Sequence, residues 1–281
     1  MHASTEPRAR FLGSPCDPER LFVIAGPCVI ESEAMTLDVA SHLREVCARL
    51  GIGLVFKSSY RKDNRSDLRS FTGPAMEDGL RILGRVAREL GIPVLTDVHC
   101  RLEIEPAARV ATVLQVPAFL SRQSRLLQET ARSGRVVNVK KGQFLAPDDM
   151  PRVLEKLRDA RPDGEFWLTE RGTSFGYHNL VVDMRGISTM RALACTVVYD
   201  VTHSLQHPGV GGDRRFARPL ARAAIAAGTD GLFLETHPDP DRALSDPTTQ
   251  LPLDSIADFL EEMQEWKSIQ GRQVRRGRIP L

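Results

Sequence analysis

The chain of 281 residues has no long apolar run and no excess of either charge. No apolar stretch reaches the roughly 18–20 residues that a helix needs to cross a bilayer, which excludes a protein anchored in that way. The formal net charge is only +2, so the composition gives no reason to expect binding to nucleic acid or to an anionic membrane. The first twenty residues lack the apolar core of a signal peptide, and we expect a cytoplasmic protein.

Cysteine is sparse, and its spacing excludes the usual paired motifs. The five residues are odd in number and scattered, with no CxxC pair: Cys16, Cys28, Cys47, Cys100 and Cys195. In a reducing compartment we expect free thiols, which argues against a disulfide at Cys28. The sequence also has neither a GxGxxG nor a GxxxxGK[ST] loop, which makes an open doubly wound nucleotide-binding sheet the less favoured architecture.

Short aliphatic runs alternate along the chain with helix-like segments, as in repeated βα units. Eight such runs are present, at 21–28, 53–59, 93–99, 112–118, 135–141, 165–172, 196–203 and 231–237. Their continuous apolarity is typical of parallel strands covered on both faces. Amphipathic segments include 32–51, 76–91 and 253–270, and glycines end the first two. This pattern predicts a single (β/α)8 TIM barrel over residues 21–270, with a polar N-terminal arm (1–20) and a basic C-terminal tail (271–281).

Each run from the second onward is apolar at its start and polar near its end. The polar residues include Lys57; Asp97 and His99; Gln115; Asn138, Lys140 and Lys141; Glu170 and Arg171; Asp200 and His203; and Glu235 and His237. In a barrel these ends meet at one mouth, which is where the active sites of such enzymes lie. Isolated charges are costly to bury, so a purely structural barrel does not need them there. We therefore predict that the mouth is functional.

Two kinds of chemistry can be assembled at this mouth. One is a cationic pocket for phosphates and carboxylates, from Lys57, Lys62, Arg65, Arg122, Lys140 and Arg171. The other is a metal site for Zn²⁺, Fe²⁺ or Mn²⁺, from Cys28, His203, Glu235 and Asp246. The residues alone leave other interpretations open, because Cys28 can be a packed thiol and His203 a hydrogen-bonded histidine at a strand end.

Eight motifs together carry a family resemblance. They are IAGPCVIES, FKSSYRKDNRS, TDVH, QVPAFLSRQ, NVKKGQFLAP, TERGTSFGYHNLVVD, YDVTHSLQ and LETHPDPDRALSDPTTQLPL. From about residue 21 to 265 the chain resembles the 3-deoxy-D-manno-octulosonate 8-phosphate synthases. The resemblance implies condensation of phosphoenolpyruvate with arabinose 5-phosphate and water, release of inorganic phosphate, and a product used in lipopolysaccharide biosynthesis. Because it has a cysteine at position 28, the chain resembles the metal-dependent subclass of this family. That resemblance implies a divalent metal ion bound by Cys28, His203, Glu235 and Asp246.

The resemblance also implies roles for the other residues at the mouth. Phosphoenolpyruvate would be bound by Lys57, Lys62, Lys140 and Arg171, with Gln115 nearby. The aldose phosphate would be bound by Asn64, Arg65, Ser66 and Asp97. Lys62, Asp97 and His203 are the candidate catalytic residues. Arg122 would reach a neighbouring subunit's site, which implies a homotetramer.

Two departures from the family pattern affect these expectations. The stretch KDNRSD at 62–67 stands where KANRSS is usual, so Asp63 and Asp67 place negative charge near a sugar phosphate unless Arg61 or Arg69 compensates. The segment after the seventh run, HSLQHPGVGGDRRFARPL, is also shorter than usual, which affects how the site is covered. The alternatives are therefore a heptulosonate 7-phosphate synthase, a related synthase for another sugar acid, and a barrel without activity that serves as a scaffold.

Overall fold

Eight parallel strands form the centre of the molecule and close on themselves. A computed structural model describes residues 9–65 and 67–277 of the chain. Pairing of β11 with β14, and of β14 with β3, completes the circle. The barrel strands are β3 (Phe22–Gly26), β4 (Gly53–Lys57), β5 (Val94–Asp97), β6 (Val113–Val116), β7 (Val136–Lys140), β8 (Phe166–Glu170), β11 (Thr196–Asp200) and β14 (Gly231–His237). All eight predicted strands are confirmed.

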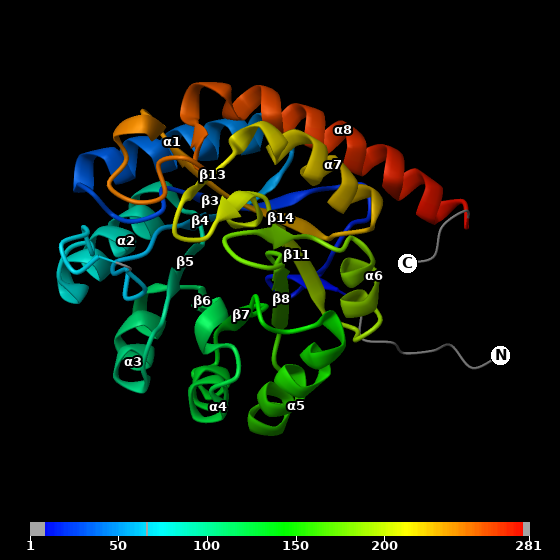
Figure 1. Ribbon diagram of the computed structural model, residues 1–281, viewed down its shortest axis with the longest axis horizontal. Helices are drawn as coiled ribbons and strands as arrows, with labels where there is room; N and C mark the ends of the chain where they lie inside the picture. The colour runs from blue at the N-terminus through cyan, green and yellow to red at the C-terminus, as the bar shows by residue number, and fades with distance from the viewer. Residues whose placement is uncertain (1–8, 66, 278–281) are drawn as a thin grey trace.

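One α-helix follows each barrel strand, and the helices surround the barrel (Figure 1). They are α1 (Glu33–Leu50), α2 (Met76–Leu90), α3 (Arg101–Val110), α4 (Ser124–Arg132), α5 (Met150–Ala160), α6 (Arg185–Arg191), α7 (Ala217–Ala226) and α8 (Ile256–Arg275). This alternation confirms the predicted single (β/α)8 barrel. None of the described helices is both long enough and apolar enough to span a membrane.

The ends of the helices follow from local sequence. Ser32 begins α1 by accepting a hydrogen bond from the backbone N–H of Met35 through its side chain. Gly51 and Gly91 end α1 and α2 with φ angles of 67° and 65°, in the left-handed region that glycine adopts readily. The predicted glycine ends are thus confirmed. Helix α8 continues to Arg275, five residues beyond the end of the segment predicted to be helical.

Short strands and 3-10 helices lie at the two ends of the barrel. Three two-stranded hairpins are β1 (Arg10–Phe11) with β2 (Ser14–Pro15), β9 (Thr173–Ser174) with β10 (Leu180–Val181), and β12 (Gln206–His207) with β13 (Gly211–Gly212). Strand β15 (Leu251–Pro252) pairs with β14. The 3-10 helices are η1 (Ala118–Leu120), η2 (Pro147–Asp149), η3 (His203–Leu205), η4 (Arg214–Phe216), η5 (Pro240–Arg242) and η6 (Leu253–Ser255).

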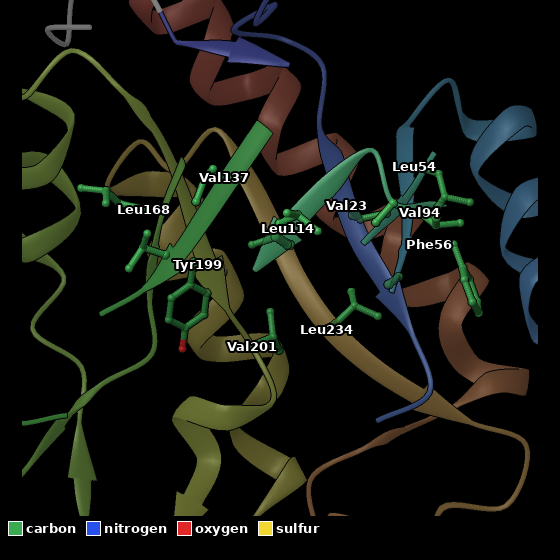
Figure 2. Packing of buried hydrophobic residues seen from close by; sticks show 14 of the residues in the cluster. Val23, Leu54, Phe56, Val94, Leu114, Val137, Leu168, Tyr199, Val201 and Leu234 are labelled. Atoms are coloured by element: carbon green, nitrogen blue, oxygen red, sulfur yellow. The ribbon is translucent and has the colours of Figure 1, made fainter. Parts of the chain in front are cut away.

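The larger core lies between the strands and the helices. Alternate residues of the strands, and Val201 directly after β11, point outward and are buried against the helices. Figure 2 shows this for Val23, Leu54, Phe56, Val94, Leu114, Val137, Leu168, Tyr199, Val201 and Leu234. Because successive side chains of a strand point to opposite faces, the residues between these point into the barrel. The barrel interior is therefore built from a second set of residues on the same strands.

The lower part of the barrel interior is apolar. We call the buried cluster there the apolar layer: Phe22, Ile24, Val55, Leu95, Val113, Trp167, Val198 and Phe233. The β1–β2 hairpin lies at this end, where Phe11 stacks on Phe22 with ring centroids 4.6 Å apart. The backbone N–H groups of Leu12 and Gly13 both donate to the carboxylate of Glu165, at 2.9 and 2.7 Å. Residues 9–15 of the segment predicted to be an arm thus close the bottom of the barrel.

Candidate active site

A layer of polar residues lies directly above the apolar layer inside the barrel. Each member follows, by two positions along its strand, an apolar residue that points inward below it, as Lys57 follows Val55 and Glu235 follows Phe233. We call this set the polar layer: Lys57, Asp97, Gln115, Asn138, Thr169, Asp200 and Glu235. All seven are buried. They lie at the carboxyl ends of the strands, where barrel enzymes have their active sites, so the predicted polar mouth is confirmed.

A buried lysine and a buried glutamate form an ion pair on one side of the mouth. Lys57 Nζ lies 2.7 Å from Glu235 Oε1, and it also donates to the backbone carbonyl of Cys28 at 3.0 Å. Lys62 Nζ lies 3.8 Å from the same glutamate oxygen. Burial alone raises the pKa of Glu235, but the positive charge of Lys57, with His203 and Lys62, lowers it well below its usual range. Glu235 is therefore a carboxylate at neutral pH.

The backbone at Gly26 brings Cys28 to this glutamate. A Cβ atom on Gly26 would lie 2.1 Å from the carbonyl oxygen of Lys57, so no other residue fits where β3 passes β4. The chain then turns through Pro27, and the Cys28 side chain is fully buried at the mouth. The backbone N–H of Cys28 donates to the Gln250 side chain at 3.2 Å, which ties this turn to the loop after β14.

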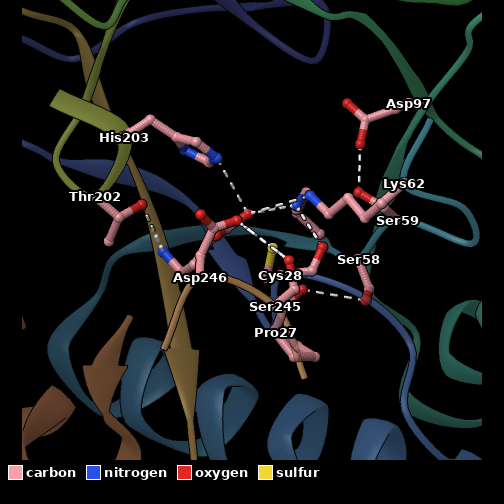
Figure 3. Close-up of polar contacts among 12 residues, drawn as sticks. Pro27, Cys28, Ser58, Ser59, Lys62, Asp97, Thr202, His203, Ser245 and Asp246 are labelled. Carbon is pink, nitrogen blue, oxygen red and sulfur yellow. Dashed lines mark hydrogen bonds and ion pairs between the residues drawn. The ribbon is translucent and has the colours of Figure 1, made fainter. Parts of the chain in front are cut away.

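Three of the four predicted metal ligands form one compact group. Single donor atoms of Cys28, Glu235 and Asp246 lie within 4.8 Å of one another. Figure 3 shows Cys28, Asp246 and His203 turned toward a common centre. His203 lies beside the group, with Nε2 3.7 Å from Glu235 Oε1. The structure thus brings all four predicted residues to one place, with His203 at its edge.

The chemistry of this group fits a divalent cation. Glu235 Oε2 is buried and has no hydrogen-bond partner among the described residues. Burial and the nearby Glu235 carboxylate raise the pKa of the Cys28 thiol well above its usual value, and a cation would favour the thiolate that can bind it. A thiolate, two carboxylates and an imidazole are donors that Zn²⁺, Fe²⁺ and Mn²⁺ accept.

Asp246 adopts an unusual backbone conformation within this group. Its φ angle is +49°, in the left-handed region that residues other than glycine seldom occupy. Aspartate tolerates this region better than most residues, and such conformations concentrate at functional sites. The Gln250 side-chain amide donates to the Ser245 carbonyl oxygen at 2.8 Å, which supports the same loop. The strained loop therefore presents the carboxylate of Asp246 to Cys28.

A second buried ion pair lies on the neighbouring side of the mouth. Lys140 Nζ donates to the Asp200 carboxylate and lies 3.5 Å from the centre of the Phe233 ring. His203 Nδ1 lies 3.0 Å from Asp200 Oδ2 and 3.3 Å from Lys140 Nζ. Burial alone raises the pKa of Asp200, but His203 and Lys140 lower it far below its usual range. The lysine and the carboxylate thus fix the orientation of the imidazole beside Glu235.

A chain of hydrogen bonds runs through the polar layer toward Asp97. The Thr169 hydroxyl donates to Asn138 at 2.7 Å, the Asn138 amide donates to Gln115 at 2.8 Å, and the Gln115 amide donates to Asp97 at 2.6 Å. The Ser59 hydroxyl donates to the other oxygen of Asp97. Burial alone raises the pKa of Asp97, but the charges of Lys57, Lys62 and His99, with the hydrogen bond from Ser59, lower it far below its usual range.

Two arginines lie at opposite sides of the group formed by Cys28, Glu235 and Asp246. Arg171 Nη2 donates to the Gln206 side chain at 2.8 Å, and Arg65 Nη1 donates to the Ser245 hydroxyl at 3.0 Å. Each guanidinium also has a buried nitrogen without a hydrogen-bond partner among the described residues, Nη1 in Arg171 and Nε in Arg65. Both therefore have a donor left for an anion.

Some of the predicted binding residues are not connected to the rest of the site within the described chain. Asn64 and Arg122 are exposed, and no hydrogen bond or ion pair within the described chain links their side chains to the other site residues. Arg122 lies between η1 and α4, where its carbonyl accepts from Lys156. Ser66 lies outside the described residues.

The two unusual carboxylates of the β4–α2 loop are paired with arginines of the same loop. Arg61 Nη2 lies 2.9 Å from Asp63 Oδ1. Asp67 accepts from the backbone N–H of Arg69 at 2.8 Å and from its guanidinium, which lowers the pKa of Asp67. Arg61 and Arg69 therefore reduce the negative charge that this loop presents to a phosphate, and both compensations considered from the sequence are present.

Several polar residues at the mouth were not assigned by the sequence. They are Ser59, Thr169, Gln206, Ser245 and Gln250. The period of two along each strand could have indicated Thr169, because it points inward two positions above Trp167. Nothing in the local sequence marks the other four, because their partners come from distant segments.

The fold and the site define a (β/α)8-barrel enzyme whose mouth brings Cys28, Glu235 and Asp246 together beside buried lysines and arginines. The sequence matches the DAHP synthetase I family over residues 15–271, and the chain belongs to that family. Curated relatives named 2-dehydro-3-deoxyphosphooctonate aldolase are similar over almost the full length. The protein from Syntrophobacter fumaroxidans is 53% identical over 90% of this chain and 89% of its own. Those from Thioalkalivibrio sulfidiphilus and Paraburkholderia xenovorans are each 54% identical, over 85% and 86% of this chain and 87% and 89% of their own.

Proposed function

We propose that this protein is a 3-deoxy-D-manno-octulosonate 8-phosphate synthase, the activity that the relatives' name denotes. It condenses phosphoenolpyruvate, arabinose 5-phosphate and water to 3-deoxy-D-manno-octulosonate 8-phosphate and inorganic phosphate, for lipopolysaccharide biosynthesis. The observation that carries the proposal is the juxtaposition of the Cys28, Glu235 and Asp246 group with the buried cations Lys57 and Lys140.

The buried cations of the mouth suit phosphoenolpyruvate. Lys140 and Arg171 are buried, and burial lowers the pKa of both side chains because it disfavours their positive charge. A bound anion would offset this effect, so the site favours an anionic ligand. The free Nη1 of Arg171 supplies one directed donor. We assign the phosphate and carboxylate of phosphoenolpyruvate to Lys57, Lys62, Lys140 and Arg171, with Gln115 nearby.

The β4–α2 loop suits the sugar phosphate. We assign the phosphate to Asn64, Arg65 and Ser66, and a sugar hydroxyl to Asp97, whose carboxylate is an acceptor only. The pairing of Asp63 and Asp67 with arginines favours arabinose 5-phosphate over an altered acceptor, because it reduces the repulsion that these carboxylates would cause.

The reaction forms a carbon–carbon bond and breaks a carbon–oxygen bond. The third carbon of phosphoenolpyruvate bonds to the aldehyde carbon, whose oxygen takes up a proton, while water adds to the second carbon and loses one. The hemiketal phosphate then releases inorganic phosphate by cleavage of its carbon–oxygen bond. Burial lowers the pKa of Lys62, but the Cys28 sulfur and Glu235 raise it overall, so its ammonium stays charged and can donate to the developing oxyanion. His203 and Asp97 lie where they can move a proton or hold a hydroxyl.

We further propose that Cys28, His203, Glu235 and Asp246 hold a divalent metal ion, Zn²⁺, Fe²⁺ or Mn²⁺. When bound, such an ion supplies Lewis-acid polarisation of an oxygen. The unpartnered Oε2 of Glu235 and the mixed thiol and carboxylate donors support this assignment.

Assembly and location follow the same proposal. We assign Arg122 to a neighbouring subunit's site in a homotetramer, which its exposure between η1 and α4 allows. We place the enzyme in the cytoplasm, because Cys16, Cys28, Cys47, Cys100 and Cys195 are free thiols, as a reducing compartment favours.

A phosphate-release assay tests the function. Purified protein is incubated with phosphoenolpyruvate and, in turn, arabinose 5-phosphate, erythrose 4-phosphate, ribose 5-phosphate and glucose 6-phosphate, and the product is identified by mass spectrometry. We expect the highest kcat/KM with arabinose 5-phosphate. A higher value with erythrose 4-phosphate would indicate a heptulosonate 7-phosphate synthase, and no release with any aldehyde would indicate a scaffold.

A further inference from the structure

Two arginines on opposite sides of the mouth reach the same metal-binding carboxylate, each through one intervening side chain. On one side, Arg171 donates to the Gln206 carbonyl oxygen at 2.8 Å, and the Gln206 amide donates to Asp246 Oδ1 at 2.9 Å. On the other side, Arg65 donates to the Ser245 hydroxyl at 3.0 Å, and that hydroxyl donates to Asp246 Oδ2 at 3.2 Å. Each oxygen of Asp246 therefore belongs to one bridge.

The two bridges begin at different anion sites. Under the proposed function, Arg171 belongs to the phosphoenolpyruvate site and Arg65 to the sugar phosphate site. Each guanidinium has one buried nitrogen without a partner among the described residues, which is the donor that an incoming anion would use. Both bridges end at a carboxylate within 4.8 Å of Cys28 and Glu235. The sites for two substrates thus meet at one ligand of the metal group.

Each bridge transmits charge in a defined direction. A guanidinium that donates to Gln206 or Ser245 polarises that group and makes it a stronger donor to Asp246. Electron density on the Asp246 oxygens is then drawn away from a bound cation. A substrate anion that pairs with the guanidinium reduces this polarisation, and Asp246 becomes the better metal ligand. Outer residues that hydrogen-bond to ligands commonly adjust metal affinity in this way.

We propose that Gln206 and Ser245 are positioning residues that couple metal affinity to substrate occupancy, Gln206 for phosphoenolpyruvate and Ser245 for arabinose 5-phosphate. The proposal rests on the proposed function and adds a regulatory link within its site. Because coupling between binding sites is reciprocal, the metal ion also tightens the binding of each substrate.

The test measures metal affinity and not turnover. The full-length protein is titrated with Mn²⁺ alone, with phosphoenolpyruvate and with arabinose 5-phosphate, and free Mn²⁺ is followed by electron paramagnetic resonance. In the unaltered protein we expect each substrate to tighten Mn²⁺ binding by about fivefold or more, the lower end of usual coupling. In Ser245→Ala the effect of arabinose 5-phosphate falls to about twofold or less while that of phosphoenolpyruvate persists, and Gln206→Met shows the reverse.

Matched variants separate coupling from general damage. Ser58→Ala removes a buried hydroxyl at the same mouth that donates to the Pro27 carbonyl at 3.1 Å, and both substrate effects should persist there. Ser245→Thr keeps a hydroxyl and should restore the effect lost in Ser245→Ala. Where Ser245→Ala or Gln206→Met fails to fold, Ser245→Gly and Gln206→Asn break the same bridges.

The possible results distinguish the two proposals. If Mn²⁺ binds and both variants leave the substrate effects unchanged, or weaken both effects equally, the coupling role is wrong and the proposed function stands. If the unaltered protein binds none of Mn²⁺, Fe²⁺ and Zn²⁺, or if Cys28→Ala binds Mn²⁺ equally well, the proposed metal site is wrong, and the coupling role is wrong with it.

Discussion

The apolar and polar layers of the barrel interior lie two residues apart on the same strands, yet they contribute to the protein in opposite ways. In the apolar layer, each fully buried Val, Leu or Phe side chain stabilises the fold by about 1.5–3 kcal/mol. In the polar layer, the pairs Lys57–Glu235 and Lys140–Asp200 are buried to a similar degree. A buried ion pair adds little net stability, because its attraction only offsets the loss of hydration. The apolar layer therefore stabilises the barrel, whereas the polar layer at the mouth adds little net stability to the fold.

Removing one charge from the polar layer should have the largest effect. Glu235→Gln leaves the buried ammonium of Lys57 without its carboxylate. We expect a loss of about 3–5 kcal/mol in the free energy of unfolding, as for other buried pairs that lose one partner, together with loss of phosphate release. Urea denaturation and the phosphate assay measure the two effects.

A surface pair provides the control for this prediction. Glu89→Gln removes a half-exposed carboxylate whose Oε1 lies 2.8 Å from Arg85, and it should change the free energy of unfolding far less than Glu235→Gln does, because solvent screens an exposed pair. Equal losses in the two variants would show that the polar layer is no more sensitive to an unpaired charge than the surface.

A change beneath the apolar layer should reduce stability and spare catalysis. Phe11→Ala removes the ring that stacks on Phe22 at 4.6 Å. Since Phe11 is only partly buried, we expect a loss of about 1–3 kcal/mol, less than for a full core Phe→Ala change, and an unchanged kcat. Thermal denaturation and steady-state kinetics measure this, with Ile269→Ala on the exposed face of α8 as a control. A large fall in kcat would mean that the two layers do not act separately.

The smallest predicted effect concerns pH and lies at the rim of the polar layer. His99 Nδ1 lies 3.1 Å from Glu103 Oε2, and the Tyr60 hydroxyl donates to the same oxygen at 2.8 Å. Burial opposes both charges, but the pair raises the pKa of His99 above 6.5 and lowers that of Glu103 from 4.5 to about 2. The pair therefore stabilises the fold most fully between these unperturbed values. This contribution is lost as the pH rises through the raised pKa of His99, or falls from 4.5 toward 2.

His99→Gln tests this dependence. The unfolding free energy of the unaltered protein should decline more between pH 6 and pH 9 than that of the variant. Denaturation in urea at the two pH values measures the difference. The exposed His207→Gln should keep the full decline. An identical decline in His99→Gln would exclude this pair as its source.

Much of both layers could be predicted from the sequence. The eight strands were predictable, because continuous apolar runs such as 231–237 have few other stable arrangements. The polar mouth was predictable as well, since the carboxyl ends of parallel strands must meet. The strand ends suggested a metal site of Cys28, His203, Glu235 and Asp246, but only the family resemblance favoured it over a packed thiol at Cys28, because these residues share no local spacing.

The remaining features depend on three-dimensional detail. The stacking of Phe11 on Trp167 joins segments more than 150 residues apart. The link from Arg65 to Ser245 spans 180 positions, and nothing near either residue marks the other. Such contacts are set by side-chain rotamers after the barrel has formed, so periodicity and propensity carry no signal for them.

The hydrogen bonds from Thr169 through Asn138 and Gln115 to Asp97 all point the same way. An amide in such a series cannot reverse alone, because two acceptors or two donors would then face each other. Substitutions at these four residues are therefore expected to be coupled in evolution. In descendants of this protein they should be retained as a set or replaced as a set, and a lineage that has lost one should have rebuilt the whole series.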